Sequence, residues 1–584
     1  AVPPPPAPDE PYTDEEDFAT GVYELYRAYT AFTAVTGPAA SRPLLIECVA
    51  LTDRLAWSLE VAEADYASAP GRLPYVNQRQ EHLIGTLISV LTETDESPEE
   101  VVVGLLLSED PAAQTAAARL LVASAPLYSD KAPPPIFHVL REESAFERLT
   151  AWVATSAEEE AAMDPIKKAL LVFATGLLAV LLLDRDVADY IVRTPVPTAL
   201  LKRLHTAPQS FDGDKAEAAQ GPLPPFLQGL TPQEMTRRAV LYRLSCLTAM
   251  GEYQEVLAPF FQEEGVELVL QGLQRMDLSC RLAAIELTSR LLAHKKFAMC
   301  FVQDAAGVDK LVELSEGEQA FQLHAALAMC LFGLASLSNV MEEVCRLPSS
   351  TFHRLVSYAI SLLRCPQEAA QKSIVLFFGM ALAFRPVLQA FDATADEHGS
   401  SSSSSNSSSS GLYSLLNLLR SGSSSSSSLG NNHPSLPPPP LSTQRRGQLA
   451  HFTTLCLRHH LRVHLAILAS TAEADAPPPL PGKRPRLNSQ DLTASSAVPS
   501  SFFRPVEVDD NATEALLARV RTGVLVLPPN WAPLQNLLHH RGLLVLLGVV
   551  ASSATGRAGA AETAKYALDC LEMATLLPAA IEEA

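Results

Sequence analysis

The chain has 584 residues, enough for several domains of ordinary size, and carries a formal net charge of −21. This charge argues against a sequence-independent hold on nucleic acid, which needs a positive surface, so we expect no direct nucleic-acid partner. Hydrophobic residues make up 47% of the chain and aromatic residues only 6%, which favours helices packed on helices over large sheets.

The first residues, AVPPPPAPDEPYTDEEDF, form a proline-rich acidic segment. It holds too little apolar surface to fold, so residues 1–18 are predicted to be a disordered tail. The segment lacks the basic and apolar regions of a signal peptide. The nine cysteines never form a CxxC pair, and most lie in apolar helical patterns, which is typical of reduced, buried thiols in an intracellular protein.

Residues 19–204 are predicted to form N-terminal helical repeats. Their most apolar stretch runs from Ala169 to Leu183 between Lys167-Lys168 and Asp184. At about 15 residues it is shorter than the roughly 20 residues that a membrane-spanning helix needs. We therefore predict a core helix that is buried on all sides, and no membrane partner.

Three polar segments interrupt the helical patterns and read as flexible connections. Residues 205–230 are rich in Pro and Gly and are predicted to be a loop. Residues 393–446 form a Ser- and Pro-rich insertion around one helix, GLYSLLNLLR, which begins at Gly411. Residues 471–510 are predicted to be a disordered basic linker.

The remaining segments repeat. They are the predicted armadillo-like repeats of residues 231–392, a long helix at 447–470 and C-terminal helical repeats at 511–584. Similar segments recur from Val266 to Val308 after 42 residues and from Val308 to Phe352 after 44. The next interval, to Leu412, is 60 residues, and subtracting an insert of about 18 residues restores the period.

Each copy contains a short, a medium and a long helical pattern, as in CRLAAIELTSRLLAH from Cys280, which is a long one. A period near 42 with this order predicts an all-α fold, an armadillo/HEAT-type α-solenoid with long disordered insertions. The alternative is a non-repetitive helical bundle whose spacings agree by chance. Gly265 and Gly307 are expected to take positive φ where the chain turns into the medium helix, and the long helices are expected to line the groove.

Motifs of catalysis are absent from the sequence. There is no GxxxxGK[ST] loop, no GxGxxG after a strand, no GxSxG elbow and no kinase set. We therefore predict a protein that is not an enzyme, with no catalytic, cofactor-binding or metal-binding residue and no cofactor. The glutamates 158–160 are expected to be solvated helix charges.

The densest histidine group is HHLRVH, residues 459–464. His460 and His464 lie four residues apart on one face of a helix and could share a metal ion. No Glu lies between them as in HExxH, and no third ligand is evident nearby in the sequence. With Arg458 and Arg462 interleaved, we interpret this segment as a solvated basic face.

The linker contains a short basic cluster, GKRPRLN, in an otherwise acidic chain. Lys483, Arg484 and Arg486 form a candidate nuclear-import signal that a receptor could reach in a disordered segment. The alternative interpretation is a solubilising linker. We predict a nuclear protein.

Several segments resemble the N-terminal armadillo-like region of the Vpr-binding protein family, also called damaged-DNA-binding-protein-1- and cullin-4-associated factor 1. They are, in chain order, LTAMGEYQEVLAPFF, LLAHKKFAMCFVQDAAGVDKLVEL, NVMEEVCRL, FFGMALAFRPVLQAFD, RVHLAIL and KYALDCLEMATLLP. The resemblance covers roughly residues 100–580, and GEYQEVL and AFRPVLQAFD are its most specific parts.

The resemblance implies a nuclear scaffold that brings substrates to a cullin-4 RING E3 ubiquitin ligase, with protein ubiquitination as its pathway. It implies protein partners: ligase substrates, self-association, and the ligase adaptor through a C-terminal propeller not present in this chain. No Trp-Asp dipeptide of a WD propeller occurs here, so no adaptor-contact residue is carried over. The alternative function is a free-standing armadillo-type adaptor in transport or signalling without ligase association.

Overall fold

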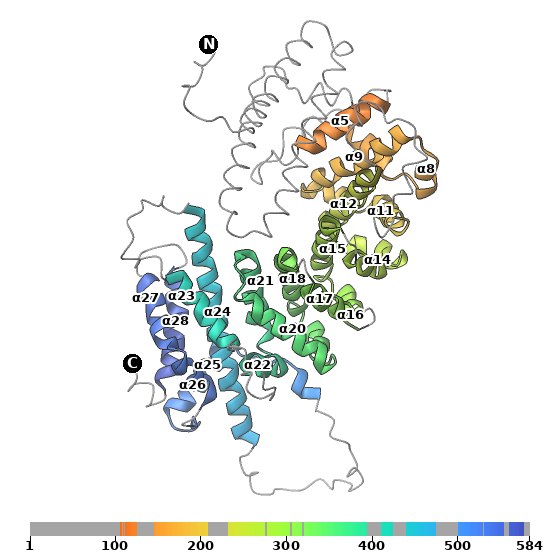
Figure 1. Cartoon of the computed structure of the whole chain (residues 1–584). Coiled ribbons are helices and arrows are strands. Elements are labelled where there is room, and N and C mark those ends of the chain that lie inside the picture. Colours follow the sequence, from red (N-terminus) through yellow and green to blue (C-terminus); the bar gives the residue numbers. More distant parts are fainter. Residues whose placement is uncertain are drawn as a thin grey trace, which may run out of the picture. The chain divides into compact units, whose positions relative to one another are not determined.

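The computed structural model describes residues 106–107, 109, 111–124, 145–207, 232–274, 277–303, 306–317, 320–393, 410–423, 440–474, 500–528, 531–553 and 560–576. Within these ranges the regular elements are helices, together with one isolated bridge between Phe384 and Pro505 (Figure 1). The predicted all-α class is confirmed. Contacts divide the chain into two compact units, Ala1–His294 and Lys295–Ala584, and each is described by itself.

The described part of the first unit contains four long helices, each packed on the next. They are α5 (Pro111–Ser124), α9 (Pro165–Leu181), α12 (Pro232–Met250) and α15 (Leu278–Leu291). Shorter helices precede them: α7 (Ala145–Val153), α8 (Ala157–Ala162), α10 (Arg185–Ile191), α11 (Val196–His205), η4 (Gln254–Val256), α13 (Leu257–Gln262) and α14 (Gly265–Leu273). The last two long helices thus complete short–medium–long triplets, as the repeat pattern predicted.

The second unit contains four such triplets. Their helices are α16 (Lys295–Gln303), α17 (Gly307–Ser315) and α18 (Ala320–Ala335); α19 (Ser338–Cys345), α20 (Ser349–Leu362) and α21 (Glu368–Ala381); α22 (Arg385–Asp392), α23 (Gly411–Ser423) and α24 (Pro440–Ala474); α26 (Ala532–His539), α27 (Gly542–Ser553) and α28 (Ala560–Thr575). The long helices pack in the row α18–α21–α24–α28. Helix α25 (Asp510–Arg521) lies between the last two triplets in sequence and packs on α24. An armadillo-type solenoid is therefore the observed fold.

The apolar run from Ala169 to Leu183 lies mainly in α9, and residues 169–178 are all buried, so the predicted core helix is confirmed. No single helix among the described residues is long and apolar enough to cross a membrane. Two bent helix pairs, Phe321–Ala335 with Ser338–Cys345 and Ala532–His539 with Gly542–Ser552, reach that threshold only when taken together.

The turn into the medium helix differs from the sequence prediction. Positive φ is found at Glu264 (51°) and Ala306 (48°), one residue before the glycines, and Gly265 and Gly307 are the first residues of α14 and α17. The prediction of positive φ at these glycines was therefore wrong. Glycine is needed there for space, because a Cβ on Gly307 would lie 2.5 Å from the ring of Phe301.

The same close approach recurs at the start of other medium helices. A Cβ would lie 2.4 Å from Phe260 at Gly265, 2.3 Å from Phe391 at Gly411 and 2.3 Å from Leu537 at Gly542. In each case a large apolar side chain of the short helix sits against the bare backbone of the glycine. The repeat is thus defined by a contact as well as by helix order.

Two predicted boundaries were placed wrongly. Helix α24 begins at Pro440 and ends at Ala474, so it extends into the predicted insertion (393–446) and the predicted linker (471–510). Residues 500–509 of that linker are also ordered: η7 (Ser500–Phe503) packs on α22, and the Val506 N–H donates to the Ala383 carbonyl at 2.8 Å. Composition alone predicted flexibility there, whereas tertiary contacts fix these residues. Most of the predicted disordered segments, including residues 1–18 and 208–230, lie outside the described residues.

The glycine contact can be tested with Gly307→Ala. The added methyl group must displace the Phe301 ring, so we expect the second unit to lose about 1–3 kcal/mol of unfolding free energy. Gly379→Ala is the matched control, because a Cβ on this α21 residue meets no atom within 4 Å. This control should stabilise the second unit by about 0.5–1 kcal/mol, because alanine is a better residue than glycine in the middle of a helix. Chemical denaturation of both variants checks the prediction, and equal effects of the two substitutions would contradict it.

Candidate functional site

Helix α24 carries the HHLRVH segment in the middle of its 35 residues. Side chains four residues apart share a helix face, and those two residues apart point in nearly opposite directions. His460 and His464 therefore lie on one face, and Arg458 and Arg462 lie on the other. Neighbouring helices cover both faces, since α24 contacts α21 and α23 as well as α25 and α28.

This segment is not a solvated basic face, and that prediction was wrong. His460 is fully buried, and Arg458 and Arg462 are only 7% and 8% exposed. The alternation of His and Arg along the sequence suggested a surface helix, but α24 stands inside a row of helices. Charged groups buried in this way require partners of opposite charge, and these come from elsewhere in the chain.

The arginine face is neutralised by two aspartates. Arg458 Nε lies 2.7 Å from Asp569 Oδ2 of α28, and an Arg458 terminal nitrogen donates to Asp510 Oδ1 of α25 at 3.1 Å. Arg462 donates to the same Asp510 oxygen. The bond from Arg462, with the charge of Arg458, holds the pKa of Asp510 below its usual range. The Arg458 guanidinium also lies 5.0 Å from the centre of the Tyr566 ring.

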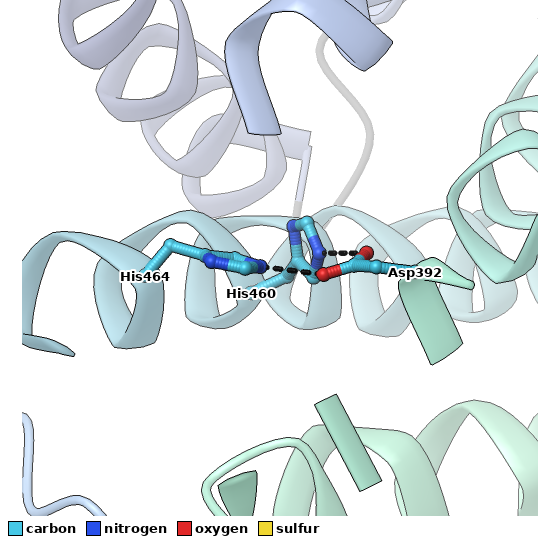
Figure 2. A group of neighbouring side chains, drawn as sticks. All are labelled: Asp392, His460 and His464. Atoms are coloured by element: carbon cyan, nitrogen blue, oxygen red, sulfur yellow. Dashed lines mark hydrogen bonds and ion pairs between the residues drawn. The ribbon is translucent and has the colours of Figure 1, made fainter. Parts of the chain in front are cut away.

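The histidine face is joined to one aspartate, the last residue of α22 (Figure 2). His460 Nε2 lies 2.8 Å from Asp392 Oδ1, and His464 Nε2 lies 2.6 Å from Asp392 Oδ2. Each imidazole thus contacts a different oxygen of the same carboxylate. Burial acts to raise the pKa of Asp392, but His460 and His464 outweigh it and hold the pKa below its usual range. Burial lowers the pKa of His464.

The sequence pattern indicated two members of this cluster, His460 and His464, but not the third, Asp392. Asp392 lies 68 residues before His460, on the far side of the Ser-rich insertion. Proximity along the sequence could not reveal it. The repeat pattern could have indicated that Asp392 lies near the histidines, because α22 and α24 are the short and long helices of one triplet. The candidate import signal Lys483, Arg484 and Arg486 lies outside the described residues.

The first unit has an ionic core of its own. Glu160 of α8 lies 2.6 Å from a terminal nitrogen of Arg243 and 3.6 Å from Nε of Arg203, which is fully buried. Burial and the charge of Arg243 lower the pKa of Arg203 to about 10. Glu160 is therefore not the solvated helix charge that we expected. Its partners come from α11 and α12, so this cluster holds three helices together.

The ionic core of the second unit can be tested with two substitutions on α28. Asp569→Asn removes a carboxylate from buried Arg458, and we expect a loss of about 1–3 kcal/mol of unfolding free energy. Glu572→Gln, three residues further on, removes a partner of Arg521, whose side chain is 42% exposed. Water screens that pair, so we expect no measurable change. Urea unfolding at neutral pH measures the unfolding free energy of both variants. A larger loss for Glu572→Gln than for Asp569→Asn would contradict the importance of the buried Arg458 pair.

Comparison with known proteins gives two matches to protein-family models. The model described as the Mahjong helical domain matches residues 228–348, and the one described as the DCAF1 helical domain matches residues 450–583. Both matches fall on the helical triplets described above.

Curated relatives agree with these matches. The chain is 28% identical over 351 residues to the DDB1- and CUL4-associated factor homolog 1 of Arabidopsis thaliana. The aligned residues make up 58% of this chain and 17% of the relative. It is 29% identical over 150 residues to Protein mahjong of Drosophila melanogaster, 25% of this chain and 10% of the relative. The chain thus spans less than a fifth of the length of these relatives.

Solved structures give weaker similarity. An engineered protein covers 95% of this chain with a TM-score of 0.43 and 14% identity, and that alignment includes 98% of the engineered chain. A designed armadillo repeat protein covers 48% of this chain with a TM-score of 0.34 and 13% identity, over 99% of its own length. Both TM-scores are below 0.5, so the fold rests on the helical triplets themselves. The family models and the curated relatives together support a similarity of this chain to the DDB1- and CUL4-associated factor 1 and mahjong proteins.

Proposed function

We propose that this chain is a non-catalytic protein-interaction scaffold, the armadillo-like part of a substrate receptor for a cullin-4 RING E3 ubiquitin ligase. The observation that carries the proposal is the pair of family matches, at residues 228–348 and 450–583, in chain order and on the helical triplets. The Arabidopsis thaliana relative is named for association with DDB1 and CUL4. Protein ubiquitination is the pathway that follows from this similarity.

The architecture supports a binding role. Stacked triplets present a row of long helices, and such a row offers an extended surface to protein partners. In the second unit, Met329 of α18 and Met380 of α21 are 44% and 43% exposed on this row. Methionine is flexible and adapts to different apolar partners, so we expect ligase substrates or other subunits to contact the long helices.

The ionic clusters support a structural role over a catalytic one. The carboxylates of Asp569, Asp392 and Glu160 are engaged by arginines or histidines and are at most 30% exposed. Pairing of this kind stabilises helix contacts, whereas general acid–base catalysis needs a group that can reach a substrate. ATP turnover that persists through extensive repurification of the chain would contradict the non-catalytic assignment.

Ligase association can be tested by affinity purification of the tagged full-length gene product from its own cells. We expect DDB1 and CUL4 to co-purify with it. The isolated 584-residue chain serves as the comparison and shows which partners the helical units bind by themselves. If the full-length product brings down neither DDB1 nor CUL4, a free-standing armadillo-type adaptor becomes the better description.

We also propose nuclear localisation, based on the basic cluster of Lys483, Arg484 and Arg486. Replacing all three by Ala should move a fluorescently tagged chain from the nucleus to the cytoplasm, because an import receptor reads clustered positive charge. A matched control replaces three arginines or lysines of the helical units that are exposed, for example Lys202, Lys167 and Arg193. Fluorescence microscopy measures the nuclear fraction of each variant. An unchanged nuclear fraction in the linker variant would show that this cluster is not the import signal.

A further inference from the structure

We propose that Asp392, His460 and His464 form a binding site for a divalent transition-metal ion of the zinc type, which joins α22 to α24. Each of the three residues offers one ligand atom, and these atoms all lie within 4.8 Å of one another. Figure 2 shows both imidazole rings and the carboxylate converging beside α24. The site is separate from the proposed partner-binding role and would exist whether or not the chain belongs to a ligase.

The donor set suits zinc. Two imidazole nitrogens and one carboxylate oxygen are common protein ligands of Zn²⁺, and three protein ligands leave a fourth position for water. The spacing of His460 and His464 on a helix places both Nε2 atoms on one side, as metal-binding histidine pairs require. The side chains of His464 and Asp392 are 20% and 21% exposed, so an ion and its water molecule have access to the cluster.

The distances require only a small adjustment. At Zn–N and Zn–O bond lengths near 2.1 Å, two ligand atoms in a tetrahedral site lie about 3.4 Å apart. In the described structure the Nε2 atoms lie 2.8 and 2.6 Å from the carboxylate oxygens. Replacing the two N–H···O contacts with an ion therefore needs a separation of roughly 0.6–0.8 Å, within the reach of side-chain torsions. In the metal-bound site each imidazole would present Nε2 to the ion and carry its proton on Nδ1.

The charge of the cluster also favours a cation. The Asp392 side chain is only 21% exposed and contacts both imidazoles, so its carboxylate is largely enclosed by protein. The nearest arginines on α24, Arg458 and Arg462, lie on the opposite face and have Asp510 and Asp569 as partners. A divalent ion would thus meet a negative group without facing an uncompensated positive one.

Location gives the ion a structural role. Asp392 ends α22 and is followed by the Ser-rich insertion, after which the chain returns as α23 and then α24. An ion held by Asp392, His460 and His464 would fasten the short helix of this triplet to its long helix. Because the ligands come from both sides of the insertion, binding is coupled to correct docking of the triplet.

The test uses the full 584-residue chain, freed of metal with a chelator and titrated with Zn²⁺ in a calorimeter. We expect one ion per chain and a thermal midpoint that rises by about 5 °C at saturating zinc. His464→Gln should weaken binding at least tenfold, because this ligand is the least buried histidine of the pair and its loss should spare folding. His451→Gln is the control, since it removes an imidazole from the same helix but outside the cluster, where His451 contacts Thr563.

Cobalt gives a second readout that does not depend on a variant. Co²⁺ in the wild-type chain should show the visible bands of a tetrahedral ion without the near-ultraviolet band of thiolate ligation, because no cysteine belongs to the cluster. Equal zinc affinity of the wild type and His464→Gln, the absence of stoichiometric binding, or a thiolate band would each overturn the proposal. In those cases the cluster is a hydrogen-bonded link between α22 and α24 and binds no metal.

Discussion

Stacking of each long helix on the next is the interaction on which the rest of the structure depends. A single triplet has apolar residues on faces that it cannot cover by itself, so its neighbours supply the core. In the second unit this gives the row α18, α21, α24 and α28, and an inner helix of the row is covered on two sides. Any polar residue at such a position must find its partner inside the protein, and this constraint explains the ionic clusters.

Helix α24 shows what this constraint demands. Its arginine face takes Asp510 and Asp569 from the following helices, and its histidine face takes Asp392 from a preceding one. The same helix is therefore tied by acidic residues to helices that precede it and helices that follow it in the sequence. Buried ion pairs contribute little net stability compared with apolar contacts, but removing one partner is costly. They consequently favour one arrangement of α22, α25 and α28 on α24 over alternatives of similar hydrophobicity.

Much of the fold could be predicted from the sequence, and less of the site. The 42-residue spacing and the order of short, medium and long helices follow from local apolar periodicity, which is readable in one sequence. The burial of His460 and Arg458 could not be read in this way, because both faces of α24 carry polar residues and only the neighbouring helices show that both are covered. Asp392 was missed because its contact with His460 joins residues that are 68 positions apart in the sequence. The role of Gly307 was misread because a sequence does not show whether a glycine is needed for positive φ or for space.

One glycine contact also explains how the solenoid tolerates an insertion inside a triplet. In three triplets the apolar residue and the glycine are five or six positions apart, as with Phe301 and Gly307, whereas Phe391 and Gly411 are separated by the Ser-rich segment. The close contact is nevertheless the same, with a distance of 2.3 Å from a Cβ on Gly411 to the Phe391 ring. Lengthening a loop whose ends are held together costs little, because closure entropy grows only with the logarithm of loop length. The contact that defines the repeat therefore also fixes the ends of the insertion, and Asp392 stands at one of those ends, beside the two histidines of α24.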